Sequence, residues 1–296
     1  MNLPSDAALG ALGALGSACT WAVTTLLVRS LSPRLNSVSV NAIRSTVGGT
    51  VLLAWVAASG GIRGLAEVSL AGFALLVVSI VLAIGIGDTI FFESVRILGL
   101  ARAMTVSMTY PLLSALLAAA VLGEPLTLPL LAGSALTLGG LVLIVATRDE
   151  ALEATGQLWS GVRAATLASV AWAISVVALK VPLAEMDAIT AQAIRLPMAG
   201  LLLWATPWAW DAAARVRSGG RATVGIIVAL SLLTAVSSVM FVAGVKYAGV
   251  AMTTVLSSTA PMFAIPLGMI FLGERLTPAA ILGTITAVAG IAVMQL

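Results

Sequence analysis

The chain has 296 residues, of which 60% are hydrophobic and only 9% are charged, and its formal net charge is +3. A soluble domain carries about 25% charged residues, so this composition excludes a soluble globular protein and makes lipid the expected solvent. The sequence has no histidine and one cysteine, Cys19. Disulfides within the chain and histidine-dependent catalytic triads are therefore excluded, and neither a metal site nor a cofactor is expected. No basic stripe or nucleic-acid motif is present, so we expect no nucleic-acid partner.

Ten apolar stretches are long enough to cross a bilayer, which takes about 20 residues. The first has no basic leader, so we interpret it as a membrane helix rather than a cleaved signal peptide. Backbone groups in lipid must be hydrogen-bonded within the chain, which predicts an all-α polytopic membrane protein. The predicted transmembrane helices are 7–29, 36–58, 69–92, 99–122, 128–147, 157–179, 187–210, 222–244, 250–272 and 277–295.

Two stretches, 99–127 and 249–277, follow one design. Each opens with small residues, carries a proline near its middle (Pro111 or Pro261) and closes on Gly-Glu-x-Leu-Thr. The similarity extends to the first helices of each half, so one half of the chain repeats the other. At an offset of 151 residues the matched pairs are Trp21 and Trp172, Arg29 and Lys180, Asn41 and Gln192, and Arg44 and Arg195.

Each repeat holds five spans, and because five is odd the second repeat must enter the membrane from the opposite side. We therefore predict two inverted five-helix repeats, 1–148 and 149–296, around a central cavity, as in many secondary transporters. The side reached after the first span is rich in arginine, and the positive-inside rule then favours both termini outside. Its basic residues are Arg29, Arg34, Arg96, Arg102, Arg148, Arg215, Arg217, Arg221 and Arg275, against Arg63, Lys180 and Lys246 on the side of the termini.

Three charged residues fall inside predicted spans: Arg44, its repeat mate Arg195, and Asp88. A charge at the centre of a membrane costs roughly 3 kcal/mol on insertion scales, so it persists only if it is paired or faces water. Either arginine could attract a carboxylate of a substrate, and Asp88 could couple transport to protons. The alternative is an internal ion pair, or side chains that reach an interface. Asp88 has no acidic mate, because Ser238 occupies the matching place.

Polar residues recur at helical spacing on four spans, which suggests a shared wettable cavity, although small polar residues also let membrane helices pack closely. Pro111 and Pro261 free backbone carbonyls and are predicted hinges, or else static kinks. Glu124 and Glu274 are interpreted as capping residues. The predicted substrate-binding residues are Trp21, Asn41, Arg44, Asp88, Ser107, Tyr110, Trp172, Gln192, Arg195, Ser237 and Ser257.

The paired pattern of a small-residue helix, a mid-span proline, the Gly-Glu-[Pro/Arg]-Leu-Thr motif and a glycine-rich final helix resembles the EamA family of the drug/metabolite transporter superfamily, in particular its YddG-type amino-acid exporters. That resemblance implies a basket-like bundle that exports small metabolites, most often amino acids, by alternating access across a bacterial inner membrane. We also expect the protein to bind a small-molecule substrate and to work as a monomer among membrane lipids. Family members commonly have both termini in the cytoplasm, contrary to the arginine distribution here.

Three alternatives stay open at this point. The substrate could be a drug or a sugar phosphate, since related branches of the superfamily carry such molecules. An intramembrane enzyme is disfavoured because the chain lacks histidine, metal ligands and an acidic pair. ATP-driven transport is disfavoured because the sequence has no phosphate-binding GxxxxGK[ST] loop. A scaffold role would predict a dry, close-packed centre instead of a polar cavity.

Overall fold

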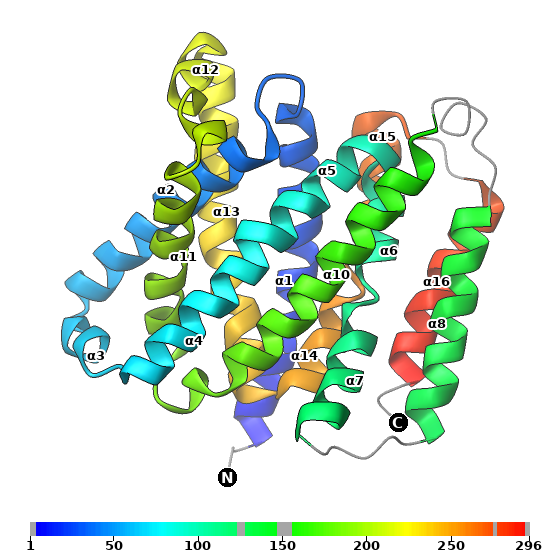
Figure 1. Ribbon diagram of the computed structural model, residues 1–296, viewed down its shortest axis with the longest axis horizontal. Helices are drawn as coiled ribbons and strands as arrows, with labels where there is room; N and C mark the ends of the chain where they lie inside the picture. Colours follow the sequence, from blue (N-terminus) through cyan, green and yellow to red (C-terminus); the bar gives the residue numbers. More distant parts are fainter. Residues whose placement is uncertain (1–3, 123–127, 147–155, 275–276, 294–296) are drawn as a thin grey trace.

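The computed structural model describes residues 4–122, 128–146, 156–274 and 277–293. Every regular element within these ranges is helical, and the helices lie side by side in one bundle, which confirms the all-α fold (Figure 1). The α-helices are α1 (Pro4–Leu31), α2 (Ser37–Ala58), α3 (Ile62–Ala66), α4 (Leu70–Ile80), α5 (Thr89–Leu98), α6 (Leu100–Ser107), α7 (Tyr110–Leu122), α8 (Leu128–Ala146), α10 (Leu158–Lys180), α11 (Ala188–Trp204), α12 (Ala212–Ser218), α13 (Gly220–Tyr247), α14 (Val250–Ser257), α15 (Ala260–Leu272) and α16 (Pro278–Val293). A π-helix, η1 (Val81–Asp88), joins α4 to α5, and η2 (Pro182–Ala184) and η3 (Pro207–Ala209) are single 3₁₀ turns.

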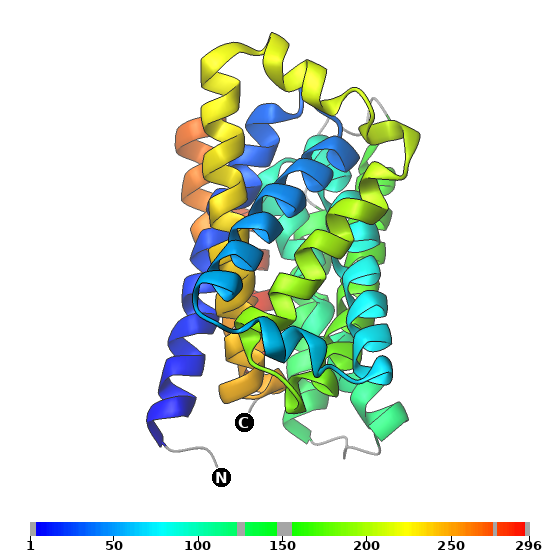
Figure 2. The same ribbon diagram turned by 90° about the vertical axis from the view of Figure 1, so that its left-hand side faces the viewer.

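Five of the described helical segments are long and apolar enough to cross a membrane alone: Ala8–Leu31, Ser37–Ala58, Leu70–Leu98, Leu158–Ala184 and Gly220–Tyr247. The predicted span 187–210 is wrong at its end, because α11 stops at Trp204 and the chain bends by 93° into η3 and α12. Pro207 explains the bend, since the residue before a proline avoids helical geometry. Figure 2 shows α12 lying across the edge of the bundle after this bend.

The fourth span of each repeat is broken into two short helices. Helix α6 ends at Ser107 and α14 ends at Ser257, and in both cases the next helix begins three residues later with a proline as its second residue. Pro111 has no N–H to bond the Ser107 carbonyl, and its ring clashes with that carbonyl; Pro261 stands in the same relation to Ser257. The two predicted hinges thus coincide with real breaks, while their movement stays a prediction.

The two repeats run in opposite directions through the bundle, as predicted. In Figure 1, α1 rises from the lower edge to the upper edge, whereas its counterpart α10 descends. Helices α8 and α16, which close the two repeats, pack against each other at one end of the bundle. Gly140 and Gly290 are matched positions, and a Cβ on either would lie 2.5 Å from backbone of the facing helix. Glycine is therefore what lets this antiparallel pair approach closely.

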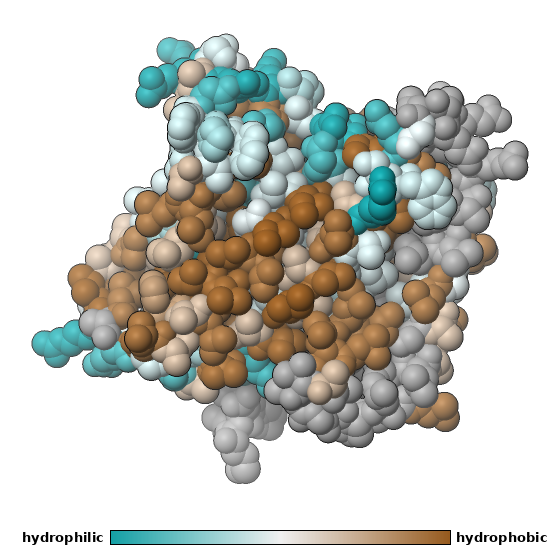
Figure 3. Space-filling model, viewed as in Figure 1, coloured by the Kyte–Doolittle hydropathy of each residue, from teal (hydrophilic) through white to brown (hydrophobic). Residues whose placement is uncertain are grey.

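The surface carries the signature of a protein embedded in lipid. A broad hydrophobic band crosses the middle of the face in Figure 3, and hydrophilic residues gather at its upper edge and at its lower left. The large exposed hydrophobic side chains include Trp159, Trp208 and Trp210. Tryptophan is enriched where a membrane meets water, so these rings fit the arginine-rich rim of a multi-pass membrane protein.

Glu274 ties the two repeats together at the end of its motif. Its carboxylate accepts hydrogen bonds from the backbone N–H groups of Leu100 (2.6 Å) and Ala101 (3.3 Å), at the start of α6 in the other repeat. A negative charge is stabilising at a helix N-terminus, where N–H groups lack helical partners. The predicted capping role is confirmed for Glu274, and Glu124 lies outside the described residues.

Candidate functional site

A cavity of about 150 Å³ lies inside the bundle between the two repeats. Two apolar clusters pack beside it, one built around Phe91, Phe92 and Leu100 and another around Leu76, Leu179 and Val242. The residues that line it are Ser17, Ala18, Trp21, Arg44, Ile80, Ala83, Ile84, Asp88, Met108, Tyr110, Trp172, Ser175, Val176, Leu179, Gln192, Arg195, Thr234, Ser237, Ser238, Phe241 and Ser257.

Nine of the eleven predicted binding residues line this cavity. Asn41 and Ser107 do not: Asn41 is buried behind Arg44, and the Ser107 hydroxyl donates to the Met104 carbonyl within its own helix. The cavity also contains hydroxyl groups outside that predicted set. Those of Ser17, Thr234 and Ser238 lie on the polar faces that helical spacing indicates, and Ser175 lies one turn beyond Trp172.

The π-helix η1 shapes one wall of the cavity and ends on Asp88. Trp172 donates its indole N–H to the Ala83 carbonyl (3.2 Å) and to Asp88 Oδ1 (2.9 Å). Gly87 makes this approach possible, since a Cβ there would lie 2.6 Å from the Trp172 ring. π-Helical turns frequently mark functional sites. This π-helix presents the Ala83 carbonyl and the Asp88 carboxylate to the Trp172 indole of the other repeat.

Arg44 is buried with all three of its nitrogen positions occupied. Its Nε donates to Asn41 Oδ1 at 2.7 Å, Nη1 donates to Thr234 at 3.2 Å, and Nη2 forms an ion pair with Asp88. The guanidinium also lies over the ring of Phe92 at 5.1 Å. A buried charge needs such a complete set of partners, so Arg44 is neutralised within the protein.

Arg195 repeats the geometry of Arg44 without the ion pair. Its Nη1 donates to Gln192 Oε1 at 2.9 Å, whereas Arg44 bonds Asn41 through Nε. Its Nη2 donates to the neutral hydroxyl of Ser79 at 2.9 Å. Its Nε is buried and has no hydrogen-bond partner in the described part of the chain. Arg195 therefore holds a buried positive charge and a donor that nothing described in the protein satisfies.

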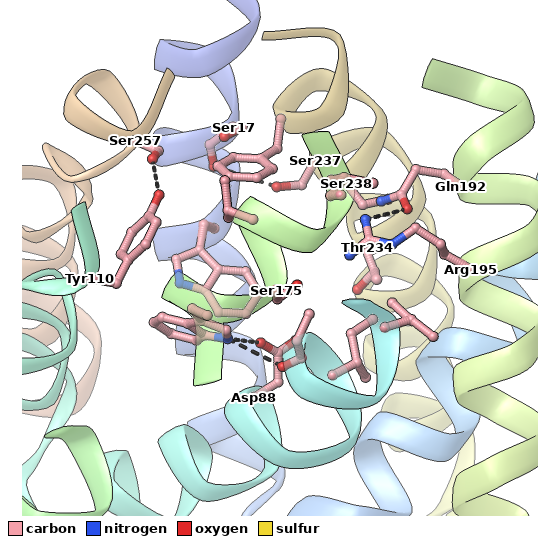
Figure 4. Close-up of a pocket in the computed structure, with 18 of the residues that line it drawn as sticks. Ser17, Asp88, Tyr110, Ser175, Gln192, Arg195, Thr234, Ser237, Ser238 and Ser257 are labelled. Atoms are coloured by element: carbon pink, nitrogen blue, oxygen red, sulfur yellow. Dashed lines mark hydrogen bonds between the residues drawn. The ribbon is translucent and has the colours of Figure 1, made fainter. Parts of the chain in front are cut away.

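The opposite end of the cavity is polar but uncharged. Tyr110 Oη and Ser257 Oγ are hydrogen-bonded at 2.6 Å, and Figure 4 shows this pair far across the cavity from Gln192 and Arg195. Between the two ends lie aromatic rings: Trp172 packs against Phe91, Tyr110 and Trp21 with centroids 5.1 to 6.0 Å apart. The site is amphipathic, with a cationic end, a hydroxyl end and an aromatic wall.

The model of the EamA-like transporter family matches the chain twice, over residues 8–146 and 159–296. The chain belongs to the EamA-like transporter family. An uncharacterized transporter of Archaeoglobus fulgidus is 27% identical over 203 residues, which is 69% of each chain. The uncharacterized transporter YvbV of Bacillus subtilis is 32% identical over 149 residues, which is 49% of this chain and 47% of that protein. These names and the family point to a membrane transporter rather than an enzyme.

A solved crystal structure shares the fold of this EamA protein. The two chains superpose with a TM-score of 0.68 at 21% sequence identity, covering 98% of this chain and 96% of the other. At that identity the similarity establishes the fold alone. The fold places the cavity between the repeats, and the residues in the cavity have to indicate what it binds.

The charge balance of this EamA cavity is set by three side chains. Among the described residues that line it, Arg44 and Arg195 are basic and Asp88 is acidic, and each is at most 6% exposed. One positive charge therefore remains uncompensated in a low-dielectric environment, where it attracts an anion far more strongly than in water. The cavity is suited to a small molecule that brings one negative charge.

Proposed function

We propose that this EamA protein is a secondary transporter that exports small amphipathic metabolites carrying a carboxylate, amino acids first among them, across a bacterial inner membrane. The observation that carries the proposal is the buried guanidinium of Arg195, which is bonded to no carboxylate among the described residues and has an unpartnered Nε. A substrate carboxylate in the cavity would cancel the charge of this guanidinium in a charge-assisted hydrogen bond.

The surrounding architecture supports alternating access around this site. Inverted repeats with a binding site at their interface, near discontinuous helices, are typical of secondary transporters. Here the breaks at Ser107 and Ser257 lie at matched positions, and apolar clusters pack beside the cavity. Rocking of one repeat against the other would open it to each side in turn. We expect the protein to act as a monomer surrounded by lipid, without a cofactor or a nucleic-acid partner.

The size of the cavity favours amino acids over the alternatives. A cavity of about 150 Å³ has about the volume of one that binds benzene, so its size suits a small amino acid better than a drug or a sugar phosphate. The aromatic wall of Trp21, Tyr110 and Trp172 would pack against the apolar part of the substrate. Hydroxyl groups of Ser237 and Ser257 would orient its polar end. Export is the direction implied by the resemblance of the repeated motif to that of amino-acid exporters.

Uptake of radiolabelled amino acids by purified protein in liposomes tests the proposal, with empty liposomes as the control. We expect saturable uptake that unlabelled substrate competes. Arg195→Gln should lower it by about tenfold to a hundredfold, because a hydrogen bond to a charged group contributes about 1.5–3 kcal/mol, and Arg195→Lys should restore part of it. Arg63→Gln removes the same charge from an exposed site and serves as the matched control.

Two results would count against the proposal. Folded protein that takes up no amino acid would shift the assignment to drugs or other metabolites. Uptake that Arg195→Gln and Arg63→Gln leave equally intact would remove Arg195 from the binding site. Size-exclusion chromatography of each variant separates a transport defect from a folding defect.

A further inference from the structure

A second hollow lies at the arginine-rich rim, separate from the central cavity. It encloses about 260 Å³ between the end of α1, the start of α2, the end of α5 and helix α12, elements that meet at the upper edge in Figure 1. Its charged lining consists of Arg29, Arg34, Arg96, Arg215 and Glu93. We call this hollow the arginine cleft.

The charges of the arginine cleft are only partly cancelled. Glu93 pairs with Arg96, and Asp211, outside the lining, pairs with Arg215 at 2.6 Å. Arg29 and Arg34 donate instead to neutral groups, a backbone carbonyl and the Thr223 hydroxyl. Clefts lined by one sign of charge concentrate ions of the other sign, so this hollow attracts anions.

One aromatic ring separates the arginine cleft from the central cavity. Phe92 lines the cleft, and its ring centroid lies 5.1 Å from Arg44 Cζ and 5.9 Å from the ring of Trp21, both of which line the cavity. Val40 also lines the cleft, one helical turn before Arg44 on α2. A molecule leaving the cavity toward this rim would pass the Phe92 ring into the cleft.

The central cavity also discriminates by net charge. Its one carboxylate in the described lining, Asp88, is already bonded to Arg44 and to the Trp172 indole. Its charge is therefore already balanced by Arg44, whereas Arg195 has no carboxylate partner among the described residues. A zwitterion has no net charge and leaves the excess positive charge of the site in place, whereas a substrate with one net negative charge cancels it.

We propose that the arginine cleft is a vestibule that captures substrates of net negative charge, and that the transporter prefers an acidic amino acid such as aspartate to its neutral isostere asparagine. The inference rests on the proposed function for the path between cleft and cavity. Binding at the cleft itself depends only on charge and geometry, so the two can be tested separately.

The first experiment measures equilibrium binding of radiolabelled aspartate and asparagine to purified Arg195→Gln protein in detergent, at low and high ionic strength. Removing the two cleft charges that have no acidic partner among the described residues, Arg29→Gln with Arg34→Gln, should weaken aspartate binding by about tenfold at low salt. Salt should have the same effect, because it screens exposed charges. The matched control is Arg217→Gln with Arg221→Gln, two exposed arginines of the same rim outside the cleft. If the Arg195→Gln protein fails to fold, the same cleft and control variants are compared in protein that keeps Arg195.

The second experiment measures initial uptake rates of the two amino acids in phosphatidylcholine and in phosphatidylglycerol liposomes. We expect aspartate uptake to exceed asparagine uptake and to fall in the cleft double variant alone. Cleft binding without any transport would contradict the proposed function but keep the cleft. Equal effects of the two double variants would overturn the cleft. The proposal would also be overturned if aspartate and asparagine were taken up equally and the cleft variant were defective only in phosphatidylglycerol liposomes. The cleft would then bind a lipid headgroup.

Discussion

Tyr110 Oη and Ser257 Oγ form a 2.6 Å hydrogen bond that joins the broken helix of one repeat to the broken helix of the other. Tyr110 is the first residue of α7, directly after the first break, and Ser257 is the last residue of α14, directly before the second. Movement of the repeats around the cavity would have to strain or break this bond. The pair is therefore placed to influence how readily the two halves separate.

Tyr110→Phe tests this link. Loss of the hydroxyl should destabilise the described conformation by about 1 kcal/mol, the usual net contribution of a hydrogen bond, and change the initial uptake rate several-fold. Ser257 keeps its bond to the Thr254 carbonyl at 3.1 Å, so no orphaned donor adds to the cost. Ser107→Ala is the control, because that hydroxyl bonds only within α6 in the described structure. Equal uptake by both variants would rule out a special role for the link.

The π-helix offers a matched pair of glycines. A Cβ on Gly87 would lie 2.6 Å from the Trp172 ring, whereas on Gly85 its nearest neighbour would be 3.9 Å away. Gly87→Ala should therefore displace Trp172 from Asp88, cost about 1–3 kcal/mol by overpacking and impair uptake. Gly85→Ala should be neutral, or stabilising by up to about 1 kcal/mol. Thermal unfolding in detergent and liposome uptake measure both effects. If Gly85→Ala lowers stability and uptake as much as Gly87→Ala does, contact with Trp172 is not the cause of the Gly87→Ala defect.

The Arg44–Asp88 pair is expected to be structural as well as functional. Asp88→Asn leaves a buried guanidinium without its counter-ion, which should destabilise the protein by about 3–5 kcal/mol. Arg44→Gln should do the same to Asp88. The double variant should lose much less than the sum, because neither charge is then unpaired. A double-mutant cycle on thermal stability measures the coupling, and strictly additive losses would show that the two residues act independently.

Glu274 should contribute through its cap on α6. Glu274→Ala should lower stability by about 1 kcal/mol, as loss of a helix cap does. The stability of Glu274→Gln should lie between those of Glu274→Ala and the wild type, because the glutamine side chain keeps one acceptor. Glu67→Ala removes an exposed glutamate at the opposite rim and is the control. Unfolding midpoints compare the three, and a cap without energetic weight would leave Glu274→Ala at the level of Glu67→Ala.

Much of the candidate site could be predicted from local pattern. Arg44, Arg195 and Asp88 attract notice because charges inside apolar spans are expensive. Polar residues at helical spacing on the segments that form α1 and α13 also lead to cavity residues such as Ser17 and Ser237. Helical spacing gives the face of a residue but not the direction of that face within the bundle. Asn41 shares a face with Arg44, yet it lies behind the arginine and holds it in place.

Other features depend on contacts between distant segments. The π-turn before Asp88 is supported by Trp172 from the other repeat, and the Thr89 hydroxyl that bonds the Ile84 carbonyl is itself held by Asn41. The bend after Trp204 could be suspected from Pro207, but hydropathy alone carried the predicted span beyond it. Periodicity within one segment contains no information about these partners.

Composition determined that this protein is embedded in lipid as helices, because the backbone of an apolar span must form its hydrogen bonds within the chain. Repetition determined that its halves are inverted, because an odd number of spans in the first repeat reverses the direction of the second. The tertiary structure decided which of the two arginines at matched positions has no counter-ion among the described residues. Arg44 ends the sequence Asn-Ala-Ile-Arg and Arg195 ends the matching sequence Gln-Ala-Ile-Arg. Among the described residues, Arg44 alone of the two contacts a carboxylate, which a span 44 residues further along the chain supplies. That difference arises from how the helices pack, since a buried charge is defined by the groups that reach it.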